Sequence, residues 1–355
     1  MTALEQIKGW AAFDPTSPLK PWSYIPRPLG PNDVEVKISH CGICYSDVHT
    51  YTSGWGPAHY PLIVGHEVVG TVTAIGSSVK HLHLGQRVGV GPQAYACMEC
   101  PHCKNHYNQI CPSRTLLYND TYKDGRVVPE ACEKISQGGY ANSIRVQSEF
   151  ALPIPDNLPS AEAAPLLCAG VTVFTPLRNL NIGLHSAVGV VGIGGLGHLA
   201  VQFAHKLGAQ VTAISHSERK RADAEKLGAT HFINVNNPEQ LAAATHSLDA
   251  ILVSSWGKDA DWNILLSMLK DFGTIVLLAV PEQALTIPPA QIVMRFLAIQ
   301  GSLIGSPMQT MDMLNFAAQH DVKPWIEVVP MKEVNIALDR LKKGDVKYRF
   351  VLANE

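Results

Sequence analysis

Residues 190–200 read VVGIGGLGHLA, and this stretch decides the fold of the central part of the chain. Gly192, Gly194 and Gly197 form the pattern G-x-G-x-x-G directly after the apolar run AVGVV (187–191). In dinucleotide-binding folds the first glycine makes a tight turn, the second lets the backbone approach a pyrophosphate, and the third lets the helix pack on the strand. The phosphates lie at the helix N-terminus, where free N–H groups favour negative charge. A plain strand–helix turn is the alternative, and the strand–turn–helix context favours the dinucleotide.

Strands and helices alternate after this turn. QVTAIS (210–215) is a second expected strand, and a helix is expected from its N-cap Ser217 to its stop at Gly228. Further strands are expected in HFINV (231–235), LDAILVSS (248–255) and GTIVLLAV (273–280). The alternation predicts an α/β fold with a doubly wound parallel sheet covered on both faces.

The first 155 or so residues have a different pattern. Short segments such as VEVKISH (34–40) and EVVGTVTAIG (67–76) are separated by Gly, Pro and Asn and predict antiparallel strands. Three prolines between 153 and 159 mark a boundary. At about 150 residues per domain, a chain of 355 residues is expected to form two domains.

Composition excludes several classes of protein. With 46% apolar and 16% charged residues, the chain can bury a sizeable core. Its 28 basic and 30 acidic residues leave a net charge of −2, which argues against binding nucleic acid or an anionic membrane. The start, MTALEQIKGW, lacks the basic and apolar segments of a signal peptide. We therefore expect a soluble, cytoplasmic protein.

Four of the eight cysteines fall within fifteen residues. Their spacing is C-x2-C-x2-C-x7-C, and in a reducing compartment such a cluster indicates a metal before disulfides. Four thiolates closing a tetrahedron suit a structural Zn²⁺. An iron–sulfur run is the alternative, but its last gap is shorter than the gap here. The expected zinc ligands are Cys97, Cys100, Cys103 and Cys111.

The end of the second strand bears on the choice of cofactor. An NAD site places Asp or Glu there to bind the ribose hydroxyls. This chain instead has Ser215, His216 and then Lys220, between two arginines, whereas Glu218 lies one step into the helix. Hydroxyls and cations can bind a 2′-phosphate, so NADP(H) is predicted over NAD. A solvated helix start is the alternative for this cluster.

A set of ordered motifs resembles the zinc-dependent medium-chain alcohol dehydrogenases, and within them the NADP-dependent cinnamyl alcohol dehydrogenase and aldehyde reductase branch. The similarity covers nearly the whole chain. Its motifs include CGICYSDVH (41–49), VGHEVVG (64–70), GGYAN (138–142) and PLLCAGVT (165–172). The resemblance implies a GroES-like, mainly β catalytic domain from residues 1–156 and 296–355, with a structural zinc lobe at about 95–113. It implies a Rossmann domain from residues 157–295, inserted between those two parts.

The resemblance also implies roles that spacing alone does not give. It implies two zinc ions per subunit, one structural and one catalytic, the catalytic ion being held by Cys44, His66 and Cys168. The expected catalytic residues near this ion are Ser46, Asp47, His49 and Glu67, with Ser46 and His49 forming a proton relay and Asp47 orienting His66. The expected cofactor contacts are Thr172, Gly192, Gly194, Gly195, Leu196, Gly197, Ser215, His216, Lys220 and Arg349.

The expected substrate is a small aldehyde or alcohol, and Trp55 and Leu117 are expected to line its pocket. Reduction of aromatic or medium-chain aliphatic aldehydes to primary alcohols with NADPH is the predicted reaction. The alternatives are NAD-linked oxidation of alcohols and a non-catalytic, metal-binding or redox-sensing protein. The resemblance implies a homodimer or homotetramer, and we expect no nucleic-acid or membrane partner.

Overall fold

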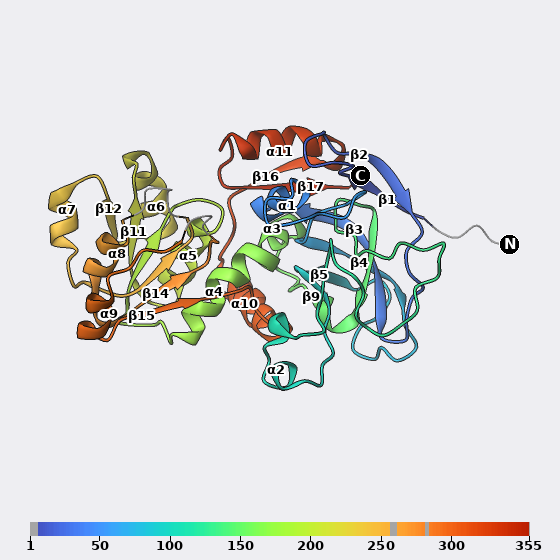
Figure 1. Cartoon of the computed structure of the whole chain (residues 1–355), viewed down its shortest axis with the longest axis horizontal. Helices are drawn as coiled ribbons and strands as arrows, with labels where there is room; N and C mark the ends of the chain where they lie inside the picture. The colour runs from blue at the N-terminus through green and yellow to red at the C-terminus, as the bar shows by residue number, and fades with distance from the viewer. Residues whose placement is uncertain (1–5, 256–260, 281–283, 355) are drawn as a thin grey trace. The chain divides into compact units, whose positions relative to one another are not determined.

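The computed structural model describes residues 6–255, 261–280 and 284–354. Residues 1–5, the first half of the segment MTALEQIKGW in which no signal peptide was expected, lie outside the described residues. The described residues fall into two compact units, drawn in Figure 1. The first unit takes in Met1–Cys168, Gly305–Ala318 and Pro324–Glu355, and the second takes in Ala169–Ile304 and Gln319–Lys323. The first unit extends past residue 156 because α3 (Ser160–Pro165) contacts its strands β3 and β4. The domain boundaries at 156/157 and 295/296 stay a prediction.

The second unit is built on a six-stranded sheet in which all neighbouring strands run parallel. The predicted strands 187–191 and 210–215 are β10 and β11, and they lie side by side in this sheet. This sheet confirms the predicted doubly wound α/β fold. The strand order is β12 (His231–Asn234), β11 (Gln210–Ser215), β10 (Ala187–Val191), β13 (Leu248–Val253), β14 (Leu269–Leu277) and β15 (Ala298–Gly301).

Helices connect these strands. The helix expected from Ser217 begins with a 3-10 turn, η4 (Glu218–Lys220), and only then becomes α6 (Arg221–Leu227). Gly228 ends α6 in the left-handed conformation, at φ 106°, as expected for a C-terminal stop. The other helices are α4 (Val171–Asn179), α5 (Gly197–Lys206), α7 (Pro238–Ala243), α8 (Trp262–Met268) and α9 (Pro289–Arg295).

The first unit contains a mainly antiparallel sheet that joins both ends of the chain. The C-terminal strand β17 pairs with the N-terminal strand β3, as the adjacent red and blue strands in Figure 1 show. The order is β16 (Ile326–Pro330), β17 (Arg349–Ala353), β3 (Asp33–Gly42), β4 (Val68–Ile75), β5 (Arg87–Val90) and β9 (Leu152–Pro153), with β8 (Ser143–Gln147) also on β3. Two small sheets pair β1 (Ile7–Ala11) with β2 (Lys20–Tyr24) and β6 (Gln93–Tyr95) with β7 (Thr115–Leu116).

The remaining elements of this unit are short, apart from one helix. They are α1 (Tyr45–Tyr51), α2 (Pro101–Lys104), η1 (Asn108–Ile110), η2 (Ser148–Phe150), α10 (Pro307–His320), η5 (Met331–Glu333) and α11 (Val334–Lys342). One helical stretch, Ser160–Asn179, is apolar and long enough to cross a membrane, but 83% of its apolar window is buried inside the protein, as in a core helix.

Candidate active site

The glycine turn after β10 has the geometry that its pattern predicts. Gly192 has a φ of 82°, in the region that favours glycine. A Cβ on Gly197 would lie 1.7 Å from the carbonyl oxygen of Gly192, so only glycine allows this approach of helix to turn. A Cβ on Gly194 would meet nothing within 4 Å. The fold therefore leaves space beside Gly194, as a bound pyrophosphate requires. Gly195 and Leu196 complete the turn and are partly exposed.

The end of β11 lies next to this turn, because the backbone N–H of Gly192 donates to Ile214. Ser215 follows, and its Oγ accepts a hydrogen bond of 3.2 Å from the N–H of Ser217. The nearest acid, Glu218, is paired with Arg221 at 2.9 Å, and this hydrogen bond lowers the pKa of Glu218. His216 is exposed and Lys220 half-buried in the same segment, so the second unit brings together the predicted 2′-phosphate residues.

The four clustered cysteines converge in the lobe between β6 and β7. The Sγ atoms of Cys97 and Cys111 are 3.6 Å apart, those of Cys100 and Cys111 3.9 Å, and those of Cys97 and Cys103 4.0 Å. A Zn–S bond of about 2.3 Å in a tetrahedron gives S···S edges of about 3.8 Å. Backbone N–H groups also lower the pKa of Cys97 to about 7, which favours its thiolate. The donor set therefore fits a closed zinc site.

A second group of donors lies in the first unit. One ligand atom from each of Cys44, His66, Glu67 and Cys168 lies within 4.8 Å of the others, and Nε2 of His66 is 3.2 Å from Sγ of Cys168. Two thiols and an imidazole are the donors that zinc prefers, and a site with three protein ligands keeps one position open. The residues thus fit a catalytic zinc ion, although 22 and 102 positions separate them along the sequence.

Three local structures bring these donors together. Cys44 is the N-cap of α1, and His66 and Glu67 immediately precede β4. Cys168 lies in a π-helical turn, η3 (Leu166–Gly170), which follows α3 and Pro165. A π-turn is rare and is often found at functional sites, because it changes the direction of side chains within a helix. The sequence pattern gave no signal for this turn.

Asp47 holds His66 in the orientation that a metal ligand needs. Its Oδ1 lies 2.8 Å from Nδ1 of His66, which leaves Nε2 to face the cysteines. Burial lowers the pKa of His66, but the carboxylate and the Cys44 thiol outweigh it and raise that pKa well above its ordinary value. The hydroxyl of Tyr118 is also 3.1 Å from Nδ1. The orienting role of Asp47 toward a metal-bound His66 stays a prediction.

Glu67 and Arg349 form a fully buried ion pair beside the cluster. Burial raises the pKa of Glu67 to about 7, against the opposing effect of Arg349. One oxygen of Glu67, Oε2, is buried without a hydrogen-bond partner among the described residues. An unpaired buried acceptor is costly, so it is a further indication that a cation belongs here. The contact of Arg349 with the cofactor stays a prediction, since its guanidinium pairs with Glu67.

The two cysteines of the site shift each other's pKa in opposite directions. A hydrogen bond from the thiol of Cys168, together with His66 and Arg349, lowers the pKa of Cys44 well below its ordinary value despite burial. The same hydrogen bond and burial raise the pKa of Cys168. One thiolate is thus stabilised before any metal binds.

The remaining predicted residues lie in several environments. The Sγ of Cys44 lies 3.4 Å from Oγ of Ser46. The ring of His49 stacks on Trp55, with centroids 4.7 Å apart, and Trp55 is 53% exposed. Leu117, by contrast, is 2% exposed and packs in the core of the first unit, so its place in a substrate pocket stays a prediction. In the second unit, Thr172 lies in the first turn of α4 and is buried.

Comparison with known proteins identifies the family. Residues 30–156 match the alcohol dehydrogenase GroES-like domain, and residues 195–319 match the zinc-binding dehydrogenase family. A probable mannitol dehydrogenase of Mesembryanthemum crystallinum is 43% identical over 97% of this chain and 93% of its own. The chain belongs to the zinc-binding alcohol dehydrogenase family. This zinc-binding alcohol dehydrogenase also resembles two solved structures, a cinnamyl alcohol dehydrogenase of Sorghum bicolor (38% identity, TM-score 0.91) and a cinnamyl alcohol dehydrogenase of Helicobacter pylori complexed with NADP(H) (32%, 0.88), each covering 98% of both chains.

Family membership confirms several predictions. The zinc-binding alcohol dehydrogenase has the expected GroES-like and Rossmann architecture and is an oxidoreductase that interconverts alcohols and aldehydes. Membership favours this enzyme over the non-catalytic, metal-binding alternative. Three features of the site had no sequence signal: the contact of Tyr118 with His66, the hydrogen bond that the hydroxyl of Tyr140 donates to Asp47, and the pairing of Arg349 with Glu67.

Proposed function

We propose that this alcohol dehydrogenase uses NADPH and a catalytic zinc ion to reduce aldehydes to primary alcohols. The observation that carries the proposal is the three-ligand donor set of Cys44, His66 and Cys168 in a chain that also has the dinucleotide turn. When bound there, zinc would supply Lewis-acid polarisation of the carbonyl oxygen and NADPH would supply the hydride.

The preference for NADPH rests on the segment after β11. No carboxylate stands at the end of that strand, and the nearest one, on Glu218, is already paired with Arg221. Ser215, His216 and Lys220 offer a hydroxyl, an imidazole and an ammonium group to a 2′-phosphate. The similar Helicobacter pylori structure, which was solved with NADP(H), supports this choice.

Residues of α1 are suited to move the proton. We assign to Ser46, whose Oγ lies 3.4 Å from Sγ of Cys44, the donation of a proton to the alkoxide oxygen. His49 lies three residues later on the same helix and is half-buried, so it would exchange that proton with solvent. The exposed ring of Trp55 beside His49 favours an aromatic or medium-chain aliphatic aldehyde.

The test follows loss of reduced-nicotinamide absorbance with benzaldehyde, comparing NADPH with NADH before and after removal of metal by a chelator. We expect faster oxidation of NADPH, abolished by chelation and restored by zinc. Faster turnover with NADH would contradict the cofactor assignment, and turnover that survives complete removal of zinc would contradict the metal assignment.

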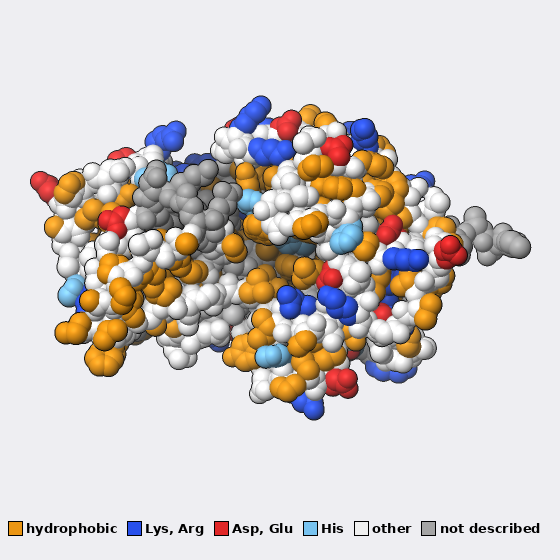
Figure 2. Space-filling model, in the orientation of Figure 1, with side chains coloured by type: hydrophobic (Ala, Val, Ile, Leu, Met, Phe, Trp, Pro, Cys, Tyr) orange, Lys and Arg blue, Asp and Glu red, His pale blue; other side chains and the backbone are white. Residues whose placement is uncertain are grey.

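We also propose that the enzyme is a homodimer formed through the second unit. Strand β15 is at the edge of the six-stranded sheet, and most of its residues are exposed. Figure 2 shows hydrophobic side chains gathered over α9, next to this edge. Val293, Met294, Phe296 and Phe272 are each about 70–80% exposed, and the two phenylalanine rings stack at 5.2 Å. A second copy would bury this apolar surface.

Light scattering on an eluting size-exclusion peak measures the oligomer directly. We expect twice the subunit mass of 38.5 kDa for the wild type and the monomer mass for Met294→Asp. A monomeric wild type, or a Met294→Asp variant that stays dimeric, would contradict this interface. A wild type of four subunits would mean that a second interface exists.

A cytoplasmic location is proposed from the cysteines. The described cysteines form no disulfide, and the two donor groups need reduced cysteines to hold a metal ion. Reduced thiols are maintained in the cytosol, whereas oxidising compartments favour disulfides. Cell fractionation tests this proposal, and recovery of the enzyme outside the cytosol would contradict it.

A further inference from the structure

We propose that Tyr140 is a positioning residue for the catalytic zinc ion, acting through Asp47. The proposal rests on the proposed zinc site and assigns to it a residue that makes no contact with the metal ligands' donor atoms. The hydroxyl of Tyr140 donates to Oδ2 of Asp47 at 2.8 Å, and the tyrosine is fully buried.

Asp47 is a saturated acceptor. Its Oδ1 accepts from the backbone N–H of Gly65 at 3.1 Å and contacts Nδ1 of His66 at 2.8 Å. Its Oδ2 accepts from the backbone N–H of Cys44 at 3.0 Å and from Tyr140. A carboxylate offers about four acceptor positions, so every one is used. Asp47 therefore connects the backbone of Cys44 with the ring of His66 and with Gly65, the residue before His66.

The hydroxyl of Tyr140 is the side-chain donor that holds Oδ2 of Asp47, whereas the hydroxyl of Tyr118 lies on the side of His66 and also interacts with the Asp47 carboxylate. The other two donors are backbone groups whose positions are set by the ligand segments. Without the hydroxyl, Oδ2 would keep one donor, and the carboxylate could rotate away from Nδ1 of His66. Groups that orient a ligating histidine typically change metal affinity by about 10–100-fold when removed.

The backbone around Tyr140 is fixed to the same ligand segment. Three hydrogen bonds, of 2.7–3.0 Å, run from the N–H groups of residues 138–140 to the carbonyls of residues 63–65, which lead directly into His66. Gly65 has a φ of 102°, and a Cβ there would lie 2.5 Å from the ring of Tyr140. The ring thus occupies the space that this glycine leaves open, beside the ligand it positions.

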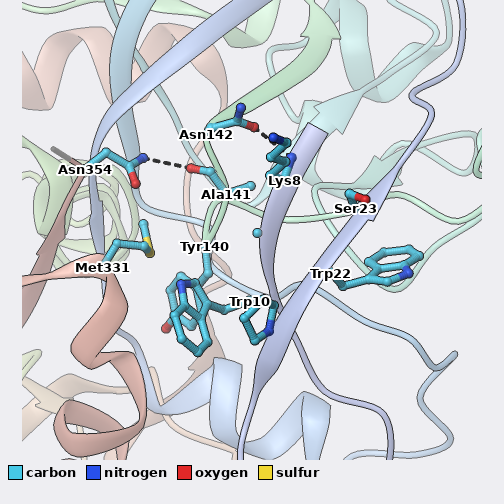
Figure 3. Close-up of a pocket in the computed structure, with 11 residues that line it drawn as sticks. Lys8, Trp10, Trp22, Ser23, Tyr140, Ala141, Asn142, Met331 and Asn354 are labelled. Carbon is cyan, nitrogen blue, oxygen red and sulfur yellow. Dashed lines mark hydrogen bonds between the residues drawn. The ribbon is translucent and has the colours of Figure 1, made fainter. Parts of the chain in front are cut away.

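The other side of Tyr140 faces a surface pocket. The pocket has a volume of about 390 Å³ and is lined by the tyrosine together with Trp10, Trp22 and Met331, as Figure 3 shows. The backbone N–H of Trp10 donates to the carbonyl of Tyr140 at 2.8 Å. This hydrogen bond uses the backbone of Tyr140, not its hydroxyl. Tyr140→Phe therefore keeps the packing and removes only the hydrogen bond to Asp47.

The experiment measures release of zinc to a coloured chelator from the wild type, Tyr140→Phe and Tyr24→Phe. Tyr24 is the matched control, because it is a buried tyrosine of the same core and is not among the hydrogen-bond partners of Asp47. The zinc ion of the four-cysteine site is an internal control in each protein. A Cys44→Ala variant, which we expect to hold only this ion, identifies the phase in which the four-cysteine site releases its zinc.

We expect Tyr140→Phe to release one zinc ion about 10–100-fold faster than the wild type, with release from the four-cysteine site and from Tyr24→Phe unchanged. Because the tyrosine acts through Asp47, Tyr140→Phe should add no further acceleration in an Asp47→Asn background. In the cobalt-substituted enzyme, the visible bands of the three-ligand site should shift in Tyr140→Phe and stay in place in Tyr24→Phe.

Three outcomes would overturn the role of Tyr140 alone: equal release from wild type and Tyr140→Phe, equal acceleration of both zinc ions, or an equal effect in Tyr24→Phe. A wild type that binds only the four-cysteine zinc would overturn the proposed function, and the role of Tyr140 with it. The zinc content of the wild type thus separates the two failures.

Discussion

Replacing Gly194 by alanine separates the stability of the glycine turn from its binding of cofactor. A Cβ at this position meets no described atom within 4 Å, and the φ of Gly194 lies outside the left-handed region. Alanine at a compatible glycine position stabilises a protein by about 0.4–1 kcal/mol, because the unfolded chain loses freedom. In the complex with NADPH, the methyl group would occupy the space needed by the pyrophosphate. We expect the Kd for NADPH to rise at least about tenfold, which is about 1.4 kcal/mol.

Gly197→Ala is the contrasting variant. Its Cβ would lie 1.7 Å from the carbonyl oxygen of Gly192, and this atom belongs to the backbone, so the turn and the start of α5 must move apart. Overpacking of this kind costs about 1–3 kcal/mol. We expect Gly197→Ala to lose both stability and cofactor binding, whereas Gly194→Ala loses binding alone.

Urea unfolding without cofactor measures the stability of both variants, and quenching of protein fluorescence measures their affinity for NADPH. The control is the unfolding midpoint of the wild type in the same buffer. Unchanged affinity in Gly194→Ala would refute the path of the pyrophosphate across this glycine. Unchanged stability in Gly197→Ala would refute the close approach of helix and turn.

Four further variants test the metal sites, a buried ion pair and a buried histidine. We expect Cys44→Ala to abolish turnover and keep one zinc ion, which metal analysis checks. We expect Cys100→Ala to lower the unfolding temperature, which calorimetry checks. Normal activity of Cys44→Ala would exclude a catalytic zinc ion at this site. Arg349→Met leaves Glu67 buried without its partner, so we expect a loss of about 3–5 kcal/mol in urea unfolding, and a loss below 1 kcal/mol would contradict the pairing. Burial lowers the pKa of His40 from its ordinary 6.5, so the unfolded chain binds a proton first and stability declines as the pH falls below 6.5. His40→Gln should reduce this decline between pH 7 and 5.5, and an equal decline in both proteins would contradict it.

The second unit could be predicted almost element by element. Its strands are short apolar runs between glycines, and β10 and β11 have the predicted bounds, because both are buried on two faces and leave an unbroken apolar pattern. The turn between β10 and α5 was predictable because three glycines have separate steric reasons to be there. The start of α6 was not, since residues 218–220 form a 3-10 turn that differs from an α-helix by one hydrogen bond.

The catalytic donors could not have been joined by spacing. Cys44 and Cys168 meet only because α1, β4 and the π-turn converge in the first unit, and this convergence depends on packing across the sheet rather than on local pattern. The resemblance to a family supplied what periodicity could not. Neither the spacing nor the resemblance predicts the hydroxyl contacts of Tyr118 and Tyr140, because in a sequence a buried tyrosine cannot be distinguished from any other core residue.

The two metal sites therefore depend on the chain in different ways. The four cysteines of the lobe lie within fifteen residues, so short loops hold them and few other contacts are required. The three catalytic donors are held instead by Asp47, Arg349 and Tyr140, which belong to α1, the last strand and the segment before β8. Those side chains meet only when the sheet that joins both ends of the chain is complete. A perturbation of that sheet should consequently affect the three-ligand site before the lobe, and for the same reason we expect the hydroxyl of Tyr140 to affect one zinc ion and leave the other unchanged.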